Sequence, residues 1–122
     1  MTSSADDLLR FIRSTFRSVW ALELLLVLKR EPRLWSRDEL VSVLRASELV
    51  VSKALDGLVA AGLASLEGEG ASYMPVSAEV ASKVDETETL YAVRPDAVRR
   101  AIVEASSSSA TAFADAFRLR KD

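Results

Sequence analysis

The chain contains no cysteine and no histidine among its 122 residues. Without a thiol or an imidazole it can form no disulfide, no cysteine nucleophile, no histidine base and no zinc site of the usual kind. Any metal or acid–base chemistry would have to rest on carboxylates, lysine, tyrosine or serine. We therefore expect a protein that is not an enzyme and that holds no metal and no cofactor.

Glycine is scarce as well, and none of the four glycines belongs to a phosphate-binding loop. Gly68-Glu69-Gly70 is not followed by the Gly-Lys-Ser/Thr sequence that such a loop requires. The acidic run Asp85-Glu86-Thr87-Glu88 lies on an expected helix, where consecutive side chains point in different directions. We interpret this run as a solvated helix face rather than a cation site.

Neither sign of charge dominates, because 16 Lys and Arg oppose 18 Asp and Glu for a net charge of −2. The whole molecule is therefore not a polycation suited to nucleic acid or to an anionic membrane. The most apolar run, Val19 to Leu28, contains Glu23 and is too short to span the ~30 Å of a bilayer core. The acidic N-terminal residues do not resemble a signal peptide. These features predict a cytoplasmic protein without a membrane partner.

Length and composition predict a single domain over residues 1–122, because hydrophobic residues make up 49% of the chain and charged residues 28%. Residues from Leu8 to about Arg30 include no glycine or proline, and Ser14-Thr15 divides them into two expected helices. Apolar spacing and polar caps predict the further helices Arg37–Arg45, Glu48–Ala61, Ser77–Val93, Ala97–Ala105 and Ala110–Arg120.

Local signals define the middle of the chain most sharply. Ser36 is an expected N-cap with Glu39 at the capping-box position, and Ser47 is the expected N-cap of the next helix. Gly62 is expected in the left-handed conformation that ends this helix. Beyond it, the strands Ala64–Glu67 and Ala71–Met74 are predicted to pair as a hairpin.

This order of elements is that of a winged helix-turn-helix. The residues that carry the resemblance are Trp35-Ser36-Arg37-Asp38-Glu39-Leu40, Ala46-Ser47, Val51-Ser52-Lys53-Ala54-Leu55, Leu58-Val59-Ala60-Ala61-Gly62-Leu63 and the wing Ala64–Met74. The stretch 16–76 resembles MarR-like winged-helix bacterial transcription regulators. The ending Phe113 to Asp122 also resembles that of small uncharacterised proteobacterial winged-helix proteins. The resemblance implies a mainly α fold with a small β-hairpin, in which residues 4–15 and 77–122 add helices for dimerisation or core cover.

The resemblance also implies double-stranded DNA as a partner, with the helix Glu48–Ala61 in the major groove. The residues expected to meet DNA are Arg37, Arg45, Ser47, Leu49, Ser52 and Lys53. Serine and lysine at these positions suit phosphates or base edges, and leucine suits a thymine methyl group. The flanking Arg37 and Arg45 suit the DNA backbone.

The charge pattern favours a second interpretation, a protein–protein interaction module without DNA binding. Lys53 is the only cation of the helix Glu48–Ala61, against the acids Glu48 and Asp56. The wing carries Glu67 and Glu69 and no basic residue, although a wing that enters the minor groove usually offers Arg or Lys. From Lys29 to Leu63 six cations oppose five anions, so few phosphate contacts are available.

Apolar residues at both ends of the chain predict an interface with a second copy or with a partner protein. They are Leu8, Phe11 and Ile12 near the start, and Phe113 with Phe117 near the end. We expect a homodimer, although these residues could also cover one another within one chain. The arginine stripe Arg10, Arg13 and Arg17 either follows a phosphate backbone or, as we favour, pairs with acids such as Asp85, Glu86 and Glu88.

Overall fold

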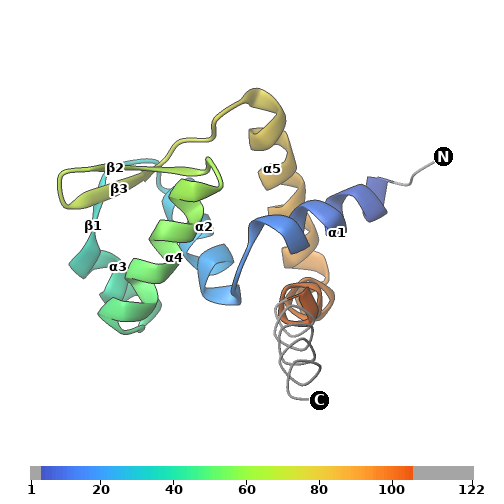
Figure 1. Cartoon of the computed structure of the whole chain (residues 1–122), viewed down its shortest axis with the longest axis horizontal. Coiled ribbons are helices and arrows are strands. Elements are labelled where there is room, and N and C mark those ends of the chain that lie inside the picture. Colours follow the sequence, from blue (N-terminus) through green and yellow to red (C-terminus); the bar gives the residue numbers. More distant parts are fainter. Residues whose placement is uncertain (1–3, 106–122) are drawn as a thin grey trace, which may run out of the picture.

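The computed structural model describes residues 4–105 of the chain. They form a mainly helical fold with one small three-stranded antiparallel sheet (Figure 1). The elements are α1 (Ser4–Thr15), α2 (Val19–Arg30), β1 (Trp35–Ser36), α3 (Arg37–Leu44), α4 (Glu48–Ala60), β2 (Ala64–Glu67), β3 (Gly70–Tyr73) and α5 (Ala78–Val93), followed by helical residues 95–105. The predicted mainly α fold with a small hairpin is confirmed. The expected helix Ala110–Arg120 lies outside the described residues.

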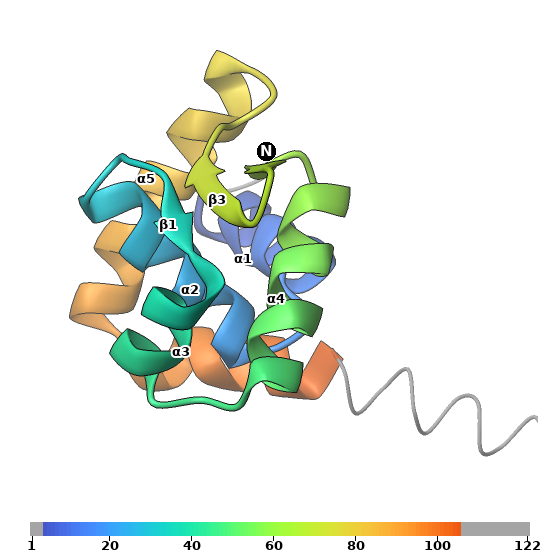
Figure 2. The same cartoon turned by 90° about the vertical axis from the view of Figure 1, so that its left-hand side faces the viewer.

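The helix α2 lies at the centre of the fold. It packs against α3, α4 and β3, and Figure 2 shows it between α4 and α5. The Ser18 hydroxyl oxygen begins the helix by accepting a hydrogen bond from the backbone N–H of Ala21 at 3.2 Å. Its buried residues are Ala21, Leu22, Leu24, Leu25, Leu26 and Leu28. Burial on so many sides is what an almost wholly apolar helix requires.

The helices α3 and α4 are joined by a turn of three residues, 45–47. Ser36 accepts a hydrogen bond from the N–H of Glu39, whose carboxylate accepts one from the N–H of Ser36, so the predicted capping box is present. Ser47 caps α4 with a single bond, which its hydroxyl oxygen accepts from the N–H of Val50. Gly62 has φ +77°, the left-handed conformation predicted after the end of α4. Short-range sequence signals therefore place this helix pair correctly.

The sheet has the strand order β1-β3-β2, with all pairs antiparallel. Gly68 and Glu69 form the two-residue turn between β2 and β3, and Gly68 supplies the positive φ of +60° that a type II′ hairpin turn places at this position. The predicted hairpin is thus confirmed. The pairing of Trp35 with Ala71 adds a third strand that was not predicted.

The first and last described helices lie on the side of α2 that faces away from the sheet (Figure 1). α1 packs against α5, and Val98 and Ile102 of the segment 95–105 are fully buried in the same core. This segment begins at Pro95 rather than at Ala97, because proline fits the first turn of a helix, where its missing N–H costs nothing. Between residues 4 and 105, every helix is too short or too polar to cross a bilayer.

Candidate functional site

The helix α4 has one buried face and one face open to solvent. Its buried residues, spaced at helical intervals, are Val51, Ala54, Leu55 and Leu58. On the other face Leu49 is 64% exposed, and Lys53 and Asp56 are exposed too. Because the buried positions hold α4 against α2 and α3, the open face is fixed in orientation. This face carries three of the six residues predicted to meet DNA, namely Leu49, Ser52 and Lys53.

Arg37 and Ser52 come together across the two helices. The Arg37 Nη1 atom donates a hydrogen bond to the Ser52 Oγ atom over 3.1 Å. Arg37 is exposed in the first turn of α3, and Ser52 lies in the second turn of α4. The contact therefore holds a guanidinium group against the open face of α4. It also leaves the Ser52 hydroxyl hydrogen available for donation to another acceptor.

The turn between α3 and α4 carries the two remaining predicted residues. Arg45 has φ 54° and ψ 41°, and it is the only non-glycine residue with positive φ among residues 4–105. Its N–H donates to the carbonyl of Val41 and so ends α3. The Ser47 hydroxyl oxygen accepts a hydrogen bond from the N–H of Val50 at 3.2 Å. Both side chains are exposed beside the start of α4.

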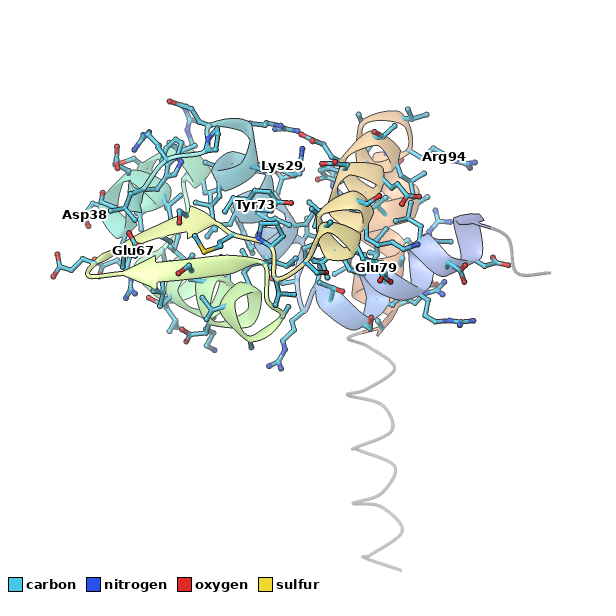
Figure 3. All side chains as sticks on the ribbon, turned by 90° about the horizontal axis from the view of Figure 1, so that it is seen from above. Lys29, Asp38, Glu67, Tyr73, Glu79 and Arg94 are labelled. Carbon is cyan, nitrogen blue, oxygen red and sulfur yellow. The ribbon has the colours of Figure 1, made fainter. Side chains whose placement is uncertain are left out.

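Carboxylates gather where the starts of α3 and α4 meet the β2–β3 turn. A polar cleft of about 390 Å³ is lined by Ser36, Arg37, Asp38, Glu48, Gly68 and Glu69. It contains three carboxylates and one guanidinium group. Asp38 and Glu67 both lie at the end of the molecule away from α5 (Figure 3). The β2–β3 turn therefore adds negative charge beside α3 and α4, and an approaching phosphate group would be repelled there.

A larger and more apolar groove lies between the start of α2 and α4, and we call it the α2–α4 groove. It has a volume of about 710 Å³ and is lined by Arg17, Ser18, Trp20, Ala21, Val50, Lys53, Ala54, Asp56, Gly57 and Ala60. Arg17 and Lys53 bring two cations to it. Arg17 was expected on a stripe with Arg10 and Arg13, but it lies beyond the end of α1 at Thr15, and its place beside the groove was not predicted. The usable signal was its position directly before the helix cap Ser18.

A second group of cations belongs to the other side of α2. The Lys29 Nζ atom lies 2.6 Å from Glu88 Oε1 and 3.0 Å from Asp85 Oδ1, and Arg30 Nε lies 3.1 Å from Glu88 Oε2. The hydrogen bond to Glu88 raises the pKa of Lys29, and the same bond lowers the pKa of Glu88. Asp85 and Glu88 thus contact cations of α2, not the arginine stripe that was expected to pair with them.

The apolar residues predicted to form an interface fall into two sets. Leu8 and Ile12 are 7% and 0% exposed inside the core of the chain itself, where α1 packs on α5. Phe11 is partly buried and stands edge-on to the ring of Phe16, with 6.3 Å between ring centroids. Phe113 and Phe117 lie outside the described residues. Leu8 and Ile12, and in part Phe11, are therefore covered by the chain itself.

The tyrosines are positioned by burial and by neighbouring charges. The Tyr91 hydroxyl donates a hydrogen bond to a carboxylate oxygen of Glu23, and burial together with this bond raises the pKa of Tyr91. The guanidinium carbon of Arg99 lies 5.4 Å from the centroid of the Tyr91 ring. The buried Tyr73 hydroxyl has no hydrogen-bond partner in residues 4–105. That part of the chain also contains no group of three or more acidic residues arranged to hold a metal ion.

A comparison of the chain with models of known protein families, with curated proteins and with solved structures found no match.

Proposed function

We propose that residues 16–76 form a winged helix-turn-helix that binds double-stranded DNA and acts in transcription regulation. The observation that carries this proposal is the open face of α4, which the Arg37–Ser52 hydrogen bond supplies with a guanidinium group. α3 and α4 are the helix-turn-helix, α4 is the recognition helix, and the β2–β3 hairpin is the wing. The order of the elements and the three-residue turn support this assignment.

The dimensions of α4 suit a major groove. Its 13 residues extend over ~20 Å, and a major groove about 12 Å wide admits one α-helix. In that position Leu49 would contact a thymine methyl group, and Lys53 would reach a guanine edge or a phosphate. Ser47 at the helix start would donate its hydroxyl hydrogen to a phosphate oxygen.

The conformation of Arg45 gives independent support. A left-handed position costs an L-residue roughly 1–2 kcal/mol, and glycine would avoid that cost. An arginine kept there, exposed and beside the start of α4, places a cation where the DNA backbone would pass. Backbone strain of this kind is often found at functional sites.

The acidic wing limits how strongly this surface can attract DNA. Arg37, Arg45 and Lys53 are the cations expected to meet DNA, and three phosphate contacts give a slope of about −3 in log affinity against log salt. Glu67 and Glu69 subtract from this attraction. We therefore expect binding that depends on base contacts by α4 and is weak on unrelated sequences.

The acidic cleft supports a second candidate function, the docking of a partner protein. Asp38, Glu48 and Glu69 line this cleft, and the neighbouring Leu49 is 64% exposed. Carboxylates around an exposed leucine are suited to a basic, partly apolar protein surface. On this alternative the same face of α4 would be used, but the charge of the partner would be opposite to that of DNA.

The deciding experiment measures binding to a library of duplexes with randomised sequence, at two salt concentrations, followed by recovery of the bound sequences. Lys53→Glu should lower the affinity for a recovered site roughly tenfold to a hundredfold, because a good base contact is worth ~1–3 kcal/mol. Lys83→Glu is the matched control, since it makes the same charge change on α5, on the other side of α2. Equal losses of duplex affinity in both variants would mean that the change in net charge, and not a contact by Lys53, causes the effect.

Leu49→Asp separates the two candidate functions from each other. Partner binding through the apolar centre of the face should be lost at both salt concentrations. The loss of DNA affinity relative to the unmodified chain should come from repulsion, so it should be largest in low salt and smaller in high salt. If no duplex is enriched from the library at either salt concentration, the DNA proposal is wrong.

A further inference from the structure

The α2–α4 groove is open because small residues line it. Ala21 of α2 faces Ala54, Gly57 and Ala60 of α4, and none of these side chains can fill the space between the helices. A Cβ atom built on Gly57 would have its nearest neighbour, Arg17 Cδ, 4.0 Å away. Trp20 borders the groove and is 42% exposed, whereas Trp35 is only 5% exposed. An indole left half open beside an unfilled apolar groove indicates a docking surface.

The described chain ends close to this groove. Arg99 and Trp20 line one small cavity of about 310 Å³, so the segment 95–105 lies against the tryptophan that borders the groove. Figures 1 and 2 both place the end of this segment at the same end of the molecule as the first turn of α2. From Arg99 to Ala105 a helix rises only ~9 Å. The chain therefore continues from a point beside the groove.

The sequence that continues from there has the composition of a docking segment. Residues 106–122 begin with four serines, which can extend up to ~14 Å. Phe113 and Phe117 follow at a spacing of four, so a helix would present them on one face together with the small residues Ala110 and Ala114. The groove volume of about 710 Å³ lies within the ~300–1,000 Å³ of pockets that enclose a drug-sized ligand, and two phenyl rings are no larger.

We propose that residues 110–120 of the same chain dock in the α2–α4 groove, with Phe113 and Phe117 inserted beside Trp20 between α2 and α4. The small side chains of α4 receive the rings, and the four serines bridge the distance from Ala105. The docked segment covers the indole of Trp20. It also covers Lys53, which lines the groove and belongs to the open face of α4.

Docking would therefore oppose the use of Lys53 by another partner. The docking proposal does not depend on DNA binding, because it is argued only from the groove, the length of the segment and its two phenyl rings. Only the consequence, autoinhibition of the α4 face, rests on the proposed function. The tests of docking and of DNA binding can accordingly fail separately.

Cysteine cross-linking in the full chain tests the docking directly. The protein has no cysteine of its own, so Ala60→Cys with Ala116→Cys introduces the only two thiols. Ala60 is exposed at the groove. We expect a short bismaleimide to link the two thiols within one chain several-fold faster than it links Ser82→Cys with Ala116→Cys, where the first thiol lies on an exposed position of α5. Phe113→Ser with Phe117→Ser should remove the difference.

Each other outcome overturns the proposal. A rate equal to that of the Ser82→Cys control means that the segment is not in the groove. A covalent dimer that forms faster at higher protein concentration means that the occupant is the segment of a second copy. A fast intramolecular link that survives the double serine change means that the phenyl rings do not hold the segment.

Acrylamide quenching of tryptophan fluorescence gives a second measurement that needs no cross-linker. Trp35 is nearly buried, so most of the quenching reports on Trp20. The double serine variant should be quenched several-fold more strongly than the unmodified chain, and Trp20→Phe should abolish this difference. If docking is confirmed and duplex affinity does not rise in the double serine variant, the docking stands and the competition with DNA fails.

Discussion

The cations of α2 and the lysine of α4 have different surroundings. At the junction of α2 and α5, Lys29 and Arg30 contact Glu88 at 2.6 and 3.1 Å, and the side chain of Lys29 is only 20% exposed. On the open face of α4, Lys53 has no ion pair with any described residue and is exposed. Lys29 and Arg30 are neutralised within the chain, whereas Lys53 faces solvent. Position along the sequence does not distinguish these roles, because all three cations lie within the stretch 16–76.

The contrast between a structural face and an open face should be largest for leucines of α4. Leu55 is 2% exposed and Leu49 is 64% exposed on the same helix. Leu55→Ala should lower the free energy of unfolding by about 2–5 kcal/mol, because it leaves a cavity in the core. Leu49→Ala should change it by less than about 0.5 kcal/mol. Urea denaturation of both variants measures the difference.

A large loss of stability in Leu49→Ala would contradict the comparison. It would mean that the face of α4 is covered in solution, for example by another copy of the chain. Repeating the denaturation at a tenfold lower protein concentration would then show whether the extra stability depends on association.

The next largest effect on stability should come from backbone conformation at two glycines, Gly57 inside α4 and Gly62 just after it. Gly62 has φ +77°, and a Cβ atom added there would lie 3.1 Å from Val76 Cγ1. Gly62→Ala should therefore destabilise the protein by at least about 1–2 kcal/mol. Gly57→Ala, in the interior of α4 with its nearest neighbour at 4.0 Å, should instead stabilise it by roughly 0.5–1 kcal/mol. Thermal unfolding should thus move in opposite directions, and a shared direction would reject this account.

The features that could be predicted from the sequence are those encoded within a few residues. The capping box of Ser36 and Glu39, the cap Ser47 and the left-handed Gly62 each depend on neighbours at most four positions away. β1 was missed because two residues form a strand only when β3, about 35 positions later, supplies the hydrogen bonds. The partners of Glu88 were missed for the same reason, since 59 residues separate it from Lys29.

The candidate site shows the same division. Leu49, Ser52 and Lys53 were predicted on the open face because helical periodicity within α4 defines that face. The α2–α4 groove could not be predicted, because it depends on how closely two helices approach across small residues distant in sequence. Arg17 enters the groove for this reason although its own neighbours belong to α1 and α2.

The ion-pair cluster at the junction of α2 and α5 should make stability depend on pH. Lys29 and Arg30 lower the pKa of Glu88, so the carboxylate contributes stability above its ordinary value of 4.5, and that contribution is lost as the pH falls through the lowered pKa. Glu88→Gln should remove less than about 1 kcal/mol at neutral pH, as expected for a partly exposed pair. The difference from the unmodified chain should shrink towards zero in acid.

Melting temperatures from pH 7 downwards measure this effect. Glu86→Gln, at an exposed position of the same helix, should follow the unmodified chain over that range. A constant offset of Glu88→Gln at every pH would show that packing of the side chain, and not its charge, stabilises the junction.

At Arg45 the needs of folding and binding oppose each other. Arg45→Gly relieves the left-handed conformation at φ 54° and should stabilise the protein by roughly 0.5–1 kcal/mol, while it removes one cation from the α4 surface. Duplex affinity should fall, and the salt slope should decrease by about one. Arg45→Ala is the matched variant, since it removes the same charge without relieving the backbone. Equal affinity losses with a stability gain in the glycine variant alone would establish that the guanidinium, at some cost in stability, serves binding. An unchanged salt slope in both variants would remove Arg45 from the proposed DNA contacts.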